Sequence, residues 1–330
     1  MARPKVSVIV PAYNIENFIE RCLNSLINQT LKEIEVIVVN DGSQDGTLAK
    51  IQEFENTNRI VVVDQKNKGT TEARKSGLNR AIGEYVLFVD GDDWLENNSI
   101  EILYDKATKT NSDIIMFHAF KVYSNRKEVA LSYSQNITKF SIVELLKGDI
   151  GPELCYKFIK LDYIRQNNIQ FPSNISFAED LATNFSLFIN NPKVSVVNTP
   201  LYNYYMREDS ITNTINSKVL EINEAFDFIK ITLMEHGVYD KYKELFGGLV
   251  YEHIFATWAL RYALKESVYS RNLYKLYKEY HINIYSNPYI REKLSGYSIG
   301  VKLRVICYHH SYRLGTLYDR MRGLTKREQS

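Results

Sequence analysis

The sequence lacks the signals of several common protein classes. It has no hydrophobic run of about 18 residues, so we expect no transmembrane helix. Its three cysteines, Cys22, Cys155 and Cys307, lie far apart and form no CxxC pair. That spacing argues against a zinc site or a disulfide framework and favours a reducing, cytoplasmic compartment. The apolar run at residues 6–11 is too short for the core of a signal peptide and stops at a proline.

Glycine-rich phosphate loops are also missing. No GxGxxG motif follows the first predicted strand, and the pattern GxxxxGK followed by Ser or Thr occurs nowhere in the chain. Those loops bind phosphates through backbone N–H groups. Because they are missing, the sequence does not support a dinucleotide-dependent enzyme or a P-loop kinase. A bound diphosphate would have to be neutralised by a metal cation and by basic side chains instead.

An excess of one charge is missing as well. The chain has 41 basic and 39 acidic residues, for a net charge of +2, which gives no case for nucleic-acid binding. The distribution is uneven, however, because residues 291–330 contain nine Lys or Arg and three Asp or Glu. We expect this basic region to contact membrane headgroups or a phosphate-bearing acceptor. A basic helix used for homodimerisation, or one that is simply solvated, is the alternative.

The first third of the chain alternates strand and helix patterns. Predicted strands lie at residues 6–10, 35–39, 60–63 and 85–89, and predicted helices at 16–27, 47–54 and 69–81. Continuous apolar strands between amphipathic helices predict an α/β fold with a parallel sheet covered on both faces. Right-handed crossovers would then bring the four strand ends to one edge, where such sheets bind ligands.

The remainder of the chain divides into two parts. A further strand is predicted at residues 113–122, and the pattern between 140 and 200 is mixed. Long helical segments follow at residues 219–235, 241–265 and 268–280. With 330 residues and 45% hydrophobic residues, the chain can bury one large core and a smaller module. We therefore predict an α/β domain at residues 1–215 and a helical, basic, Tyr-rich module at residues 216–330.

Polar residues follow each predicted strand, and the acidic sequence Asp90-Gly-Asp-Asp93 is the most informative of them. Three carboxylates within four residues repel one another, so a partly buried cluster would be unfavourable without a cation. Carboxylate and phosphate oxygens are the ligands that Mn²⁺ and Mg²⁺ prefer. The sequence therefore predicts a metal site at the sheet edge. The alternative is a solvated acidic turn that caps the next helix.

Three segments, in this order, resemble the hallmark motifs of family 2 glycosyltransferases with the GT-A fold. They are VSVIVPAYN at residues 6–14, VNDGSQDGT at 39–47 and FVDGDDW at 88–94, the last containing a DXD motif. The resemblance is strong over residues 5–120, moderate over 150–215 and weak afterwards. It implies a Rossmann-like mixed sheet, with residues 1–120 binding the nucleotide sugar and 121–215 forming the acceptor and catalytic part.

The resemblance also implies an inverting transferase that uses a nucleotide-diphosphate sugar, usually a uridine diphosphate sugar. The residues that it assigns to the donor are Pro11, Ala12, Tyr13, Asn14, Asp41, Lys68, Arg74, Asp90, Gly91 and Asp93. Within this set, Asp41 would accept a hydrogen bond from uracil, and Asp90 would face the ribose and the donor sugar. Asp92 would be the main ligand of a Mn²⁺ or Mg²⁺ cofactor. Ordinary packing is the alternative for Tyr13, and a solvated side chain for Lys68.

A second acidic pair resembles the family's ED motif, FAEDL at residues 177–181. The resemblance implies that Asp180 is the general base and that Glu179 orients the acceptor or donor sugar. Both could instead be first-turn acids that complement a helix N-terminus. The segment YNYYMREDS at residues 202–210 resembles the motif that follows, which implies that Arg207 stabilises the departing diphosphate. The family's usual histidine two residues later is Asp209 here, so a histidine metal ligand from this loop is not expected.

These observations predict a metal-dependent hexosyltransferase. We expect a UDP-sugar donor, UDP-galactose or UDP-glucose first, and a sugar acceptor. Similarity to bacterial polysaccharide enzymes of the O-antigen or capsule type implies a glycan linked to undecaprenyl diphosphate, at the cytoplasmic face of the membrane. Two other functions remain open: a nucleotidyltransferase, which should carry a Gly- and Arg/Lys-rich loop after the first strand, and a non-catalytic relative that binds glycan or nucleotide.

Overall fold

The computed structural model describes residues 3–57, 59–173, 175–207, 216–265 and 267–324. The chain forms two compact units, the first comprising Met1–Ser141 with Ile150–Ser210, and the second comprising Ile142–Asp149 with Ile211–Ser330. The domain boundary predicted at residue 215 lies outside the described residues. The structure assigns helix α5 (Ile142–Lys147) to the second unit, although the sequence pattern had placed it in the first.

The first half of the sheet is parallel, as the alternating pattern predicted. Strand β1 (Val6–Ala12) pairs in parallel with β2 (Ile34–Asp41) and with β4 (Tyr85–Phe88), and β2 pairs in parallel with β3 (Ile60–Gln65). Strands β1, β2 and β4 are almost entirely buried, because helices cover both of their faces. The carboxyl ends of all four strands therefore meet at one edge.

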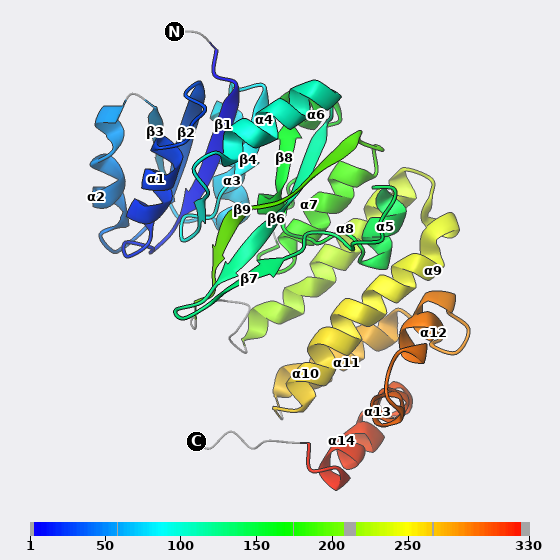
Figure 1. Ribbon diagram of the computed structural model, residues 1–330. Helices are drawn as coiled ribbons and strands as arrows, with labels where there is room; N and C mark the ends of the chain where they lie inside the picture. The colour runs from blue at the N-terminus through cyan, green and yellow to red at the C-terminus, as the bar shows by residue number, and fades with distance from the viewer. Residues whose placement is uncertain (1–2, 58, 174, 208–215, 266, 325–330) are drawn as a thin grey trace. The chain divides into compact units, whose positions relative to one another are not determined.

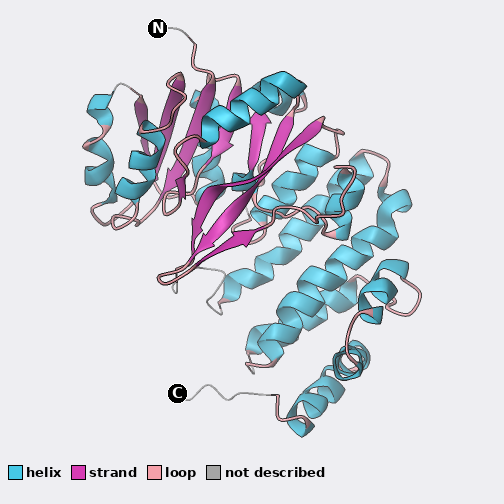
Figure 2. Cartoon of the chain, in the orientation of Figure 1, coloured by secondary structure: helices cyan, strands magenta, loops and turns pink. Residues whose placement is uncertain are grey.

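The other half of the sheet is mostly antiparallel (Figure 2). Strand β8 (Lys157–Lys160) pairs antiparallel with β4 and with β6 (Ile114–Val122). Strand β9 (Val194–Tyr205) runs parallel to β6, and the short strand β5 (Trp94–Leu95) lies beside β9. A hairpin joins β6 to β7 (Lys127–Ala130). The resulting order is β3-β2-β1-β4-β8-β6-β9-β5, a mixed sheet that confirms the predicted strand at residues 113–122.

Helices cover both faces of this sheet (Figure 1). Helix α1 (Ile19–Ile27) and helix α4 (Ser99–Thr110) bury their apolar residues with β1, β2 and β4 in one core cluster. Helix α3 (Thr70–Arg80) packs on the opposite face, where a Cβ added at Gly77 would lie 2.4 Å from Ile9 Cγ2. That glycine lets α3 approach β1 closely. Helices α2 (Thr47–Gln52), α6 (Leu161–Gln166) and α7 (Glu179–Phe188) complete the first unit, with the 3-10 turns η1 (Glu55–Thr57) and η2 (Leu154–Tyr156).

The second unit is helical, as the periodicity after residue 215 predicted. Its elements are α5, η3 (Ser217–Glu221), α8 (Ile222–Glu235), α9 (Tyr239–Val250), η4 (Tyr251–Ala259), α10 (Leu260–Ala263), α11 (Val268–Glu279), α12 (Pro288–Ser295), α13 (Ile299–His310) and α14 (Tyr312–Met321). Aromatic side chains fill its core, and the rings of Phe255 and Tyr277 stack with centroids 4.4 Å apart. Among the described helices, none combines the length and the apolar character that crossing a bilayer requires.

Candidate active site

The loops that follow β1 and β2 are hydrogen-bonded to each other. Asn14 adopts a left-handed conformation with φ of 50°, and its Oδ1 accepts from the Gln44 amide at 2.8 Å. The Asn14 amide in turn donates to Ser43 Oγ. Tyr13 is 46% exposed beside this junction, whereas Ala12 is buried. Asn14 therefore fixes the two loops, and the side chain of Tyr13 is exposed beside them.

Asp41 lies at the end of β2 and organises the turn before α3. Its carboxylate is buried and accepts hydrogen bonds from Gln65 Nε2 at 2.7 Å and from the amides of Lys68 and Gly69 at 2.9 and 2.8 Å. Gly69 has a φ of 89°, which a residue with a Cβ rarely adopts. Asp41 thus holds the exposed Lys68 at the sheet edge. A contact between Asp41 and uracil stays a prediction.

The turn after β4 is tightly packed. A Cβ added at Gly91 would lie 2.4 Å from Ile15 Cδ1, so a glycine is needed for the turn to sit against the first loop. Asp93 is fully buried, and its two oxygens accept from the Tyr202 hydroxyl and the Tyr205 amide, each at 2.7 Å. Burial raises the pKa of Asp93 well above its usual range, and the charges of Asp92 and Asp90 add to the shift.

The environment of Asp93 bears on the role that the sequence resemblance implies for it. Its carboxylate is enclosed, and its oxygens accept hydrogen bonds from two residues of strand β9. Asp93 therefore joins the acidic turn to β9, and a contact between Asp93 and the donor stays a prediction.

Asp92 has a different environment, although it is adjacent in sequence. Its Oδ2 lies 3.1 Å from Arg207 Nε, and its backbone carbonyl accepts from Arg21 Nη2 at 2.8 Å. The Asp92 side chain keeps 21% of its surface exposed. Burial raises the pKa of Asp92, and Asp90 raises it further, whereas Arg207 lowers it. A carboxylate in this position is favoured in its charged form by a nearby cation.

The donor set around Asp92 suits a cation that is shared with a ligand. Among the described residues, no group of three or more His, Cys, Asp or Glu side chains is arranged to enclose a metal ion. Mg²⁺ and similar ions are often held by one or two carboxylates, with substrate phosphates and water filling the remaining positions. Asp92 is a carboxylate of this kind, so the residues fit a metal that arrives with a diphosphate.

Arg74 connects the acidic turn to the predicted ED pair. Its Nη2 lies 3.0 Å from Asp90 Oδ1, and its Nη1 lies 2.5 Å from Asp180 Oδ1 and 3.8 Å from Glu179 Oε1. The Arg74 side chain is 4% exposed, whereas the three carboxylates keep between 22% and 28% of their surface exposed. One buried guanidinium therefore brings the residues after β4 and the start of α7 together at the sheet edge.

Glu179 and Asp180 are the first two residues of α7. Asp180 Oδ2 also accepts from the Leu154 amide at 3.1 Å, so both of its oxygens are oriented. Burial, and then the charge of Asp180, raise the pKa of Glu179 to about 7. The two acids do occupy a helix N-terminus, but their contacts with Arg74 also connect them to the predicted donor site.

Comparisons with known proteins identify the family of this chain. The model of the family described as Glycosyl transferase family 2 matches residues 7–165. EpsH of Bacillus subtilis, which is named as a glycosyltransferase, is 30% identical over 252 residues that cover 74% of this chain and 73% of EpsH. The chain belongs to glycosyltransferase family 2.

Other relatives of this family 2 glycosyltransferase differ in how much of their length is matched. Glycosyltransferase GlyA of Streptococcus pneumoniae is 32% identical over 73% of this chain, but the match covers only 36% of GlyA. The chain spans 63% of a second relative, the uncharacterized glycosyltransferase EpsJ of Bacillus subtilis. The cholesterol galactosyltransferase of Borreliella burgdorferi is 29% identical, with 85% of this chain and 82% of that protein covered.

The fold of this family 2 glycosyltransferase also has a solved counterpart. The structure of S. aureus TarS 1–349 in complex with UDP-GlcNAc matches it with a TM-score of 0.75 and 21% identity, covering 97% of this chain and 92% of that one. At this identity the match shows the fold, which is GT-A, as the sequence motifs predicted.

Sequence reasoning missed two residues of the transferase site. The guanidinium of Arg21, on α1, lies 3.8 Å from the centroid of the Trp94 ring and 4.6 Å from that of Tyr205. Arg21 therefore supports the Asp92 backbone while it is enclosed by two aromatic rings. Nothing in the spacing of the helix distinguishes Arg21 from a solvated arginine. The Tyr202 hydroxyl was missed as well, because its partner Asp93 is far away in sequence.

A hollow of about 420 Å³ lies beside Arg207 in the first unit of the transferase. It is lined by Phe18, Tyr123, Ser124, Asn125, Arg126, Tyr205, Met206 and Arg207. Because Arg207 also contacts Asp92, this hollow is next to the predicted cation site. The predicted segment beyond Arg207, including Asp209, lies outside the described residues.

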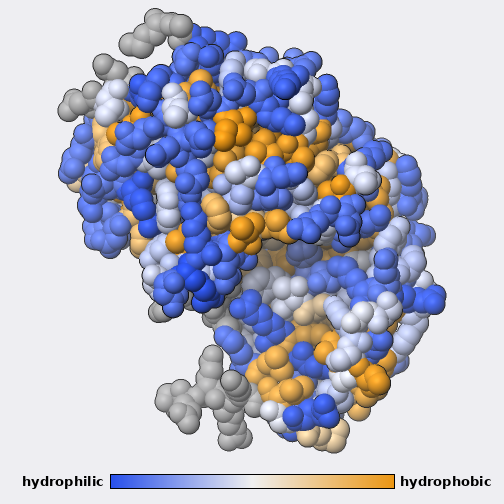
Figure 3. Space-filling model, in the orientation of Figure 1, coloured by the Kyte–Doolittle hydropathy of each residue, from blue (hydrophilic) through white to orange (hydrophobic). Residues whose placement is uncertain are grey.

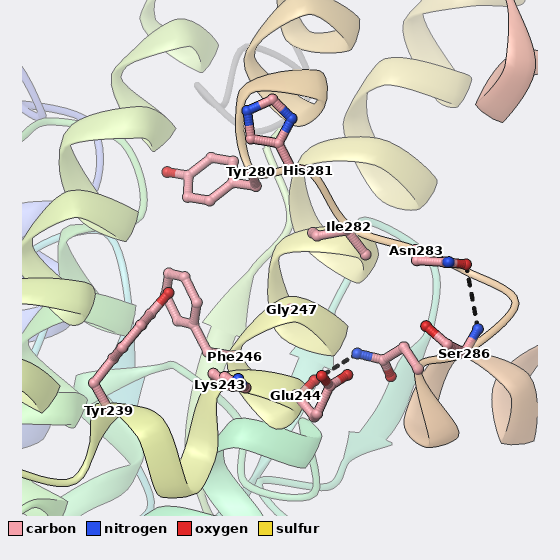
Figure 4. A pocket seen from close by; sticks show the side chains of 11 residues that line it. Tyr239, Lys243, Glu244, Phe246, Gly247, Tyr280, His281, Ile282, Asn283 and Ser286 are labelled. Carbon is pink, nitrogen blue, oxygen red and sulfur yellow. Dashed lines mark hydrogen bonds between the residues drawn. The ribbon is translucent and has the colours of Figure 1, made fainter.

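A second hollow, of about 260 Å³, lies in the helical unit between α9 and the segment after α11 (Figure 4). Aromatic rings of Tyr239, Phe246 and Tyr280 line one side, and Asn283 and Ser286 line the other. Glu244 is the only acid in this lining, so the hollow lacks the paired carboxylates that the transfer chemistry needs. We therefore place the candidate active site at the sheet edge.

Proposed function

We propose that this glycosyltransferase transfers a hexose from a UDP-sugar to a sugar acceptor with inversion at the anomeric carbon. The observation that carries the proposal is the position of Arg74, which contacts both Asp90 and Asp180. It joins a carboxylate of the predicted donor site to the predicted general base. UDP-galactose and UDP-glucose are the first candidates for the donor. The galactosyl transfer named for the Borreliella relative and the UDP-GlcNAc bound by TarS support a UDP-sugar of this size.

On the donor side, Asp92 would hold Mn²⁺ or Mg²⁺ together with the diphosphate oxygens. When bound, the cation would supply positive charge that stabilises the departing UDP. Arg207 lies 3.1 Å from Asp92, so it is placed to add a charge-assisted hydrogen bond to the same diphosphate. Exposed Tyr13 and Lys68 at the neighbouring loops would contact the nucleoside or the phosphates.

On the acceptor side, inversion requires one in-line displacement. The acceptor oxygen forms a bond to the anomeric carbon while the bond from that carbon to the diphosphate oxygen breaks. The hydroxyl proton passes to the carboxylate of Asp180, which must therefore be ionised beforehand. The Arg74 guanidinium at 2.5 Å orients that carboxylate. Glu179, whose Oε1 lies 3.8 Å from the same guanidinium, would orient the acceptor.

We further propose a lipid-linked acceptor, a glycan on undecaprenyl diphosphate, used at the cytoplasmic face of the membrane in surface polysaccharide synthesis. The hollow beside Arg207 supports an acceptor of this kind. Its aromatic rings, Phe18, Tyr123 and Tyr205, offer apolar faces to a sugar ring. Arg126 in the same lining offers charge to an acceptor phosphate, because Arg207 is assigned to the donor diphosphate.

A panel of UDP-sugars tests the proposed reaction. UDP release from UDP-galactose, UDP-glucose and their N-acetylated forms should require Mn²⁺ or Mg²⁺ and should be faster with one sugar than with the others. Release of UDP from none of them, with either metal, would contradict the proposal. Formation of a UDP-sugar from UTP and a sugar phosphate would instead favour a nucleotidyltransferase. UDP that fails to raise the unfolding temperature in Mn²⁺ would favour a non-catalytic glycan binder.

A further inference from the structure

Helices α13 and α14 form a hairpin that is held together by a buried ion pair. Asp319 on α14 is fully buried and accepts from Arg304 Nε at 2.6 Å and from Arg304 Nη2 at 2.9 Å. The Tyr308 hydroxyl donates to the same carboxylate at 2.8 Å. A Cβ added at Gly315 would overlap the Tyr308 ring, so α14 approaches α13 at this glycine. One face of α14 is therefore fixed against α13.

The opposite face of α14 is apolar and exposed. Leu314, Leu317 and Met321 have 51%, 53% and 71% of their surface exposed. Their spacing places them in one stripe along the helix, away from Gly315 and Asp319. Helix α13 adds exposed Ile299 at its start. Figure 3 shows hydrophobic surface over this part of the helical unit. Exposed apolar side chains gathered on one helix face are typical of an interaction surface.

The exposed stripe is accompanied by basic residues, and the described sequence around them holds a single acid. Arg313 lies four residues before Leu317 and Arg320 lies three residues after it, so both flank the stripe. Residues 296–324 contain five Lys or Arg and a single acid, Asp319. That acid is buried and paired with Arg304, so it offers no charge to the surface. The face is therefore both apolar and positively charged.

We propose that this α14 face docks on the surface of an anionic lipid bilayer. The face is defined as Arg313, Leu314, Leu317, Arg320 and Met321. An amphipathic helix with basic residues beside an apolar stripe lies in the plane of a membrane, with its apolar side chains below the headgroups. Anionic headgroups would supply the negative charge that the stretch itself lacks. The ion pair between Arg304 and Asp319 holds the stripe in one orientation before binding.

The same charges argue against a second copy as the occupant. In a symmetric dimer each face meets an identical face, so Arg313 and Arg320 would find no acid on the α14 face of the second copy. Such an interface would combine apolar contact with like-charge repulsion, and no acid on the face would relieve it. Docking on lipid does not depend on the transfer reaction, so it can succeed or fail independently of the proposed function.

Vesicle flotation of the full chain tests the apolar part of the proposal. The protein should float with vesicles of phosphatidylcholine containing about one third phosphatidylglycerol, and much less with pure phosphatidylcholine. The double variant Leu317→Gln with Met321→Gln should lose flotation. A matched control is Ile231→Gln with Met234→Gln on α8, where both side chains are similarly exposed, at 53% and 56%. This control should float like the unmodified protein.

Substitutions of the two arginines test the contribution of charge to the proposed binding. Arg313→Gln and Arg320→Gln should each weaken binding about five-fold, the value expected for one basic residue at an anionic surface. Higher salt should weaken it further. Arg80→Gln, at an exposed position on α3, is the matched charge control. All variants should keep their unfolding temperature and their release of UDP from a soluble donor.

Three results would overturn the proposal. The first is equal flotation of the Leu317 and Met321 double variant, and the second is equal flotation on vesicles with and without phosphatidylglycerol. The third is sedimentation showing that the protein is a dimer and that the double variant becomes a monomer. That result would assign the α14 face to a second copy of the chain.

Discussion

Arg74 Nη1 lies 2.5 Å from Asp180 Oδ1, although the two residues are 106 positions apart in sequence. The same guanidinium contacts Asp90, so a single side chain on α3 holds the end of β4 and the start of α7 together. Because Arg74 is almost completely buried, its charge is compensated by these carboxylates rather than by water. Both the stability of the site and the orientation of the Asp180 carboxylate should depend on it.

Two substitutions of Arg74 distinguish the effect of its positive charge from the effect of its planar guanidinium. Arg74→Met leaves the carboxylates of Asp90, Glu179 and Asp180 without a counter-charge, so the free energy of unfolding should fall by about 3 kcal/mol. Arg74→Lys keeps the charge but cannot reach two carboxylates at once with a planar fork. The lysine variant should therefore stay more stable than the methionine variant and still lose most turnover. Denaturant unfolding and UDP release measure the two effects. Equal stability of the two variants would contradict this role for Arg74.

Asp180→Asn should reduce turnover by about 10²–10⁴-fold, the contribution typical of a positioned general base. UDP binding should change little, because the donor contacts proposed above do not involve Asp180. Steady-state transfer and calorimetric UDP binding distinguish the two quantities. Asp162→Asn, an exposed acid at the first turn of α6, is the matched control and should keep full turnover. If the two variants retain similar activity, Asp180 is not the base.

Asp92→Asn tests the predicted cation ligand. In the unmodified protein, UDP at about 100 times its dissociation constant should stabilise the folded state by about 2.7 kcal/mol, provided that Mn²⁺ is present. The variant should lose most of this metal-dependent stabilisation, because the amide carries no charge to hold the cation. Thermal unfolding with and without Mn²⁺ measures the effect. Asp105→Asn, at an exposed position on α4, should behave like the unmodified protein.

The raised pKa of Glu179 predicts that the free energy of unfolding depends on pH. Its pKa in the folded protein is about 7, above the ordinary glutamate value of 4.5. The folded state therefore binds more protons than the unfolded state between these values, and its stability falls as the pH rises through this window. Glu179→Gln should remove that loss, so the variant should gain up to about 3 kcal/mol relative to the unmodified protein at pH 8, and little at pH 4. Denaturant unfolding at both pH values measures this difference. A constant difference across the range would contradict the shifted pKa.

Much of the parallel half of the sheet could be predicted from sequence, because β1, β2 and β4 consist mostly of apolar residues. Strand β8 could not be predicted. It has only four residues, and two of them are lysines. Lys157 is nevertheless fully buried, because its ammonium donates to the carbonyls of Gly151 and Glu153. Strand β9 contains Pro200 and a register shift where it pairs with β6. Tertiary contacts, rather than local pattern, decide both strands.

In the candidate site, too, the contacts of single residues could not be predicted from the local sequence. Asp92 and Asp93 are adjacent acids, and the motif resemblance assigned both of them to the donor or its metal. The structure separates them, because Asp93 is buried against Tyr202, which is 109 positions away. The contact between Arg74 and Asp180 is equally invisible in sequence, since no local spacing connects α3 to α7. The motifs identified which residues meet at the edge, and the packing determines what each of them contacts.

The most direct measurement is the electron density of a crystal soaked with UDP and manganese. The account predicts a manganese peak bound by Asp92 and the diphosphate oxygens. It also predicts that the Asp180 carboxylate faces the diphosphate across the space that the donor sugar would occupy. An acidic turn without manganese, or an Asp180 carboxylate that points into solvent away from UDP, would contradict it.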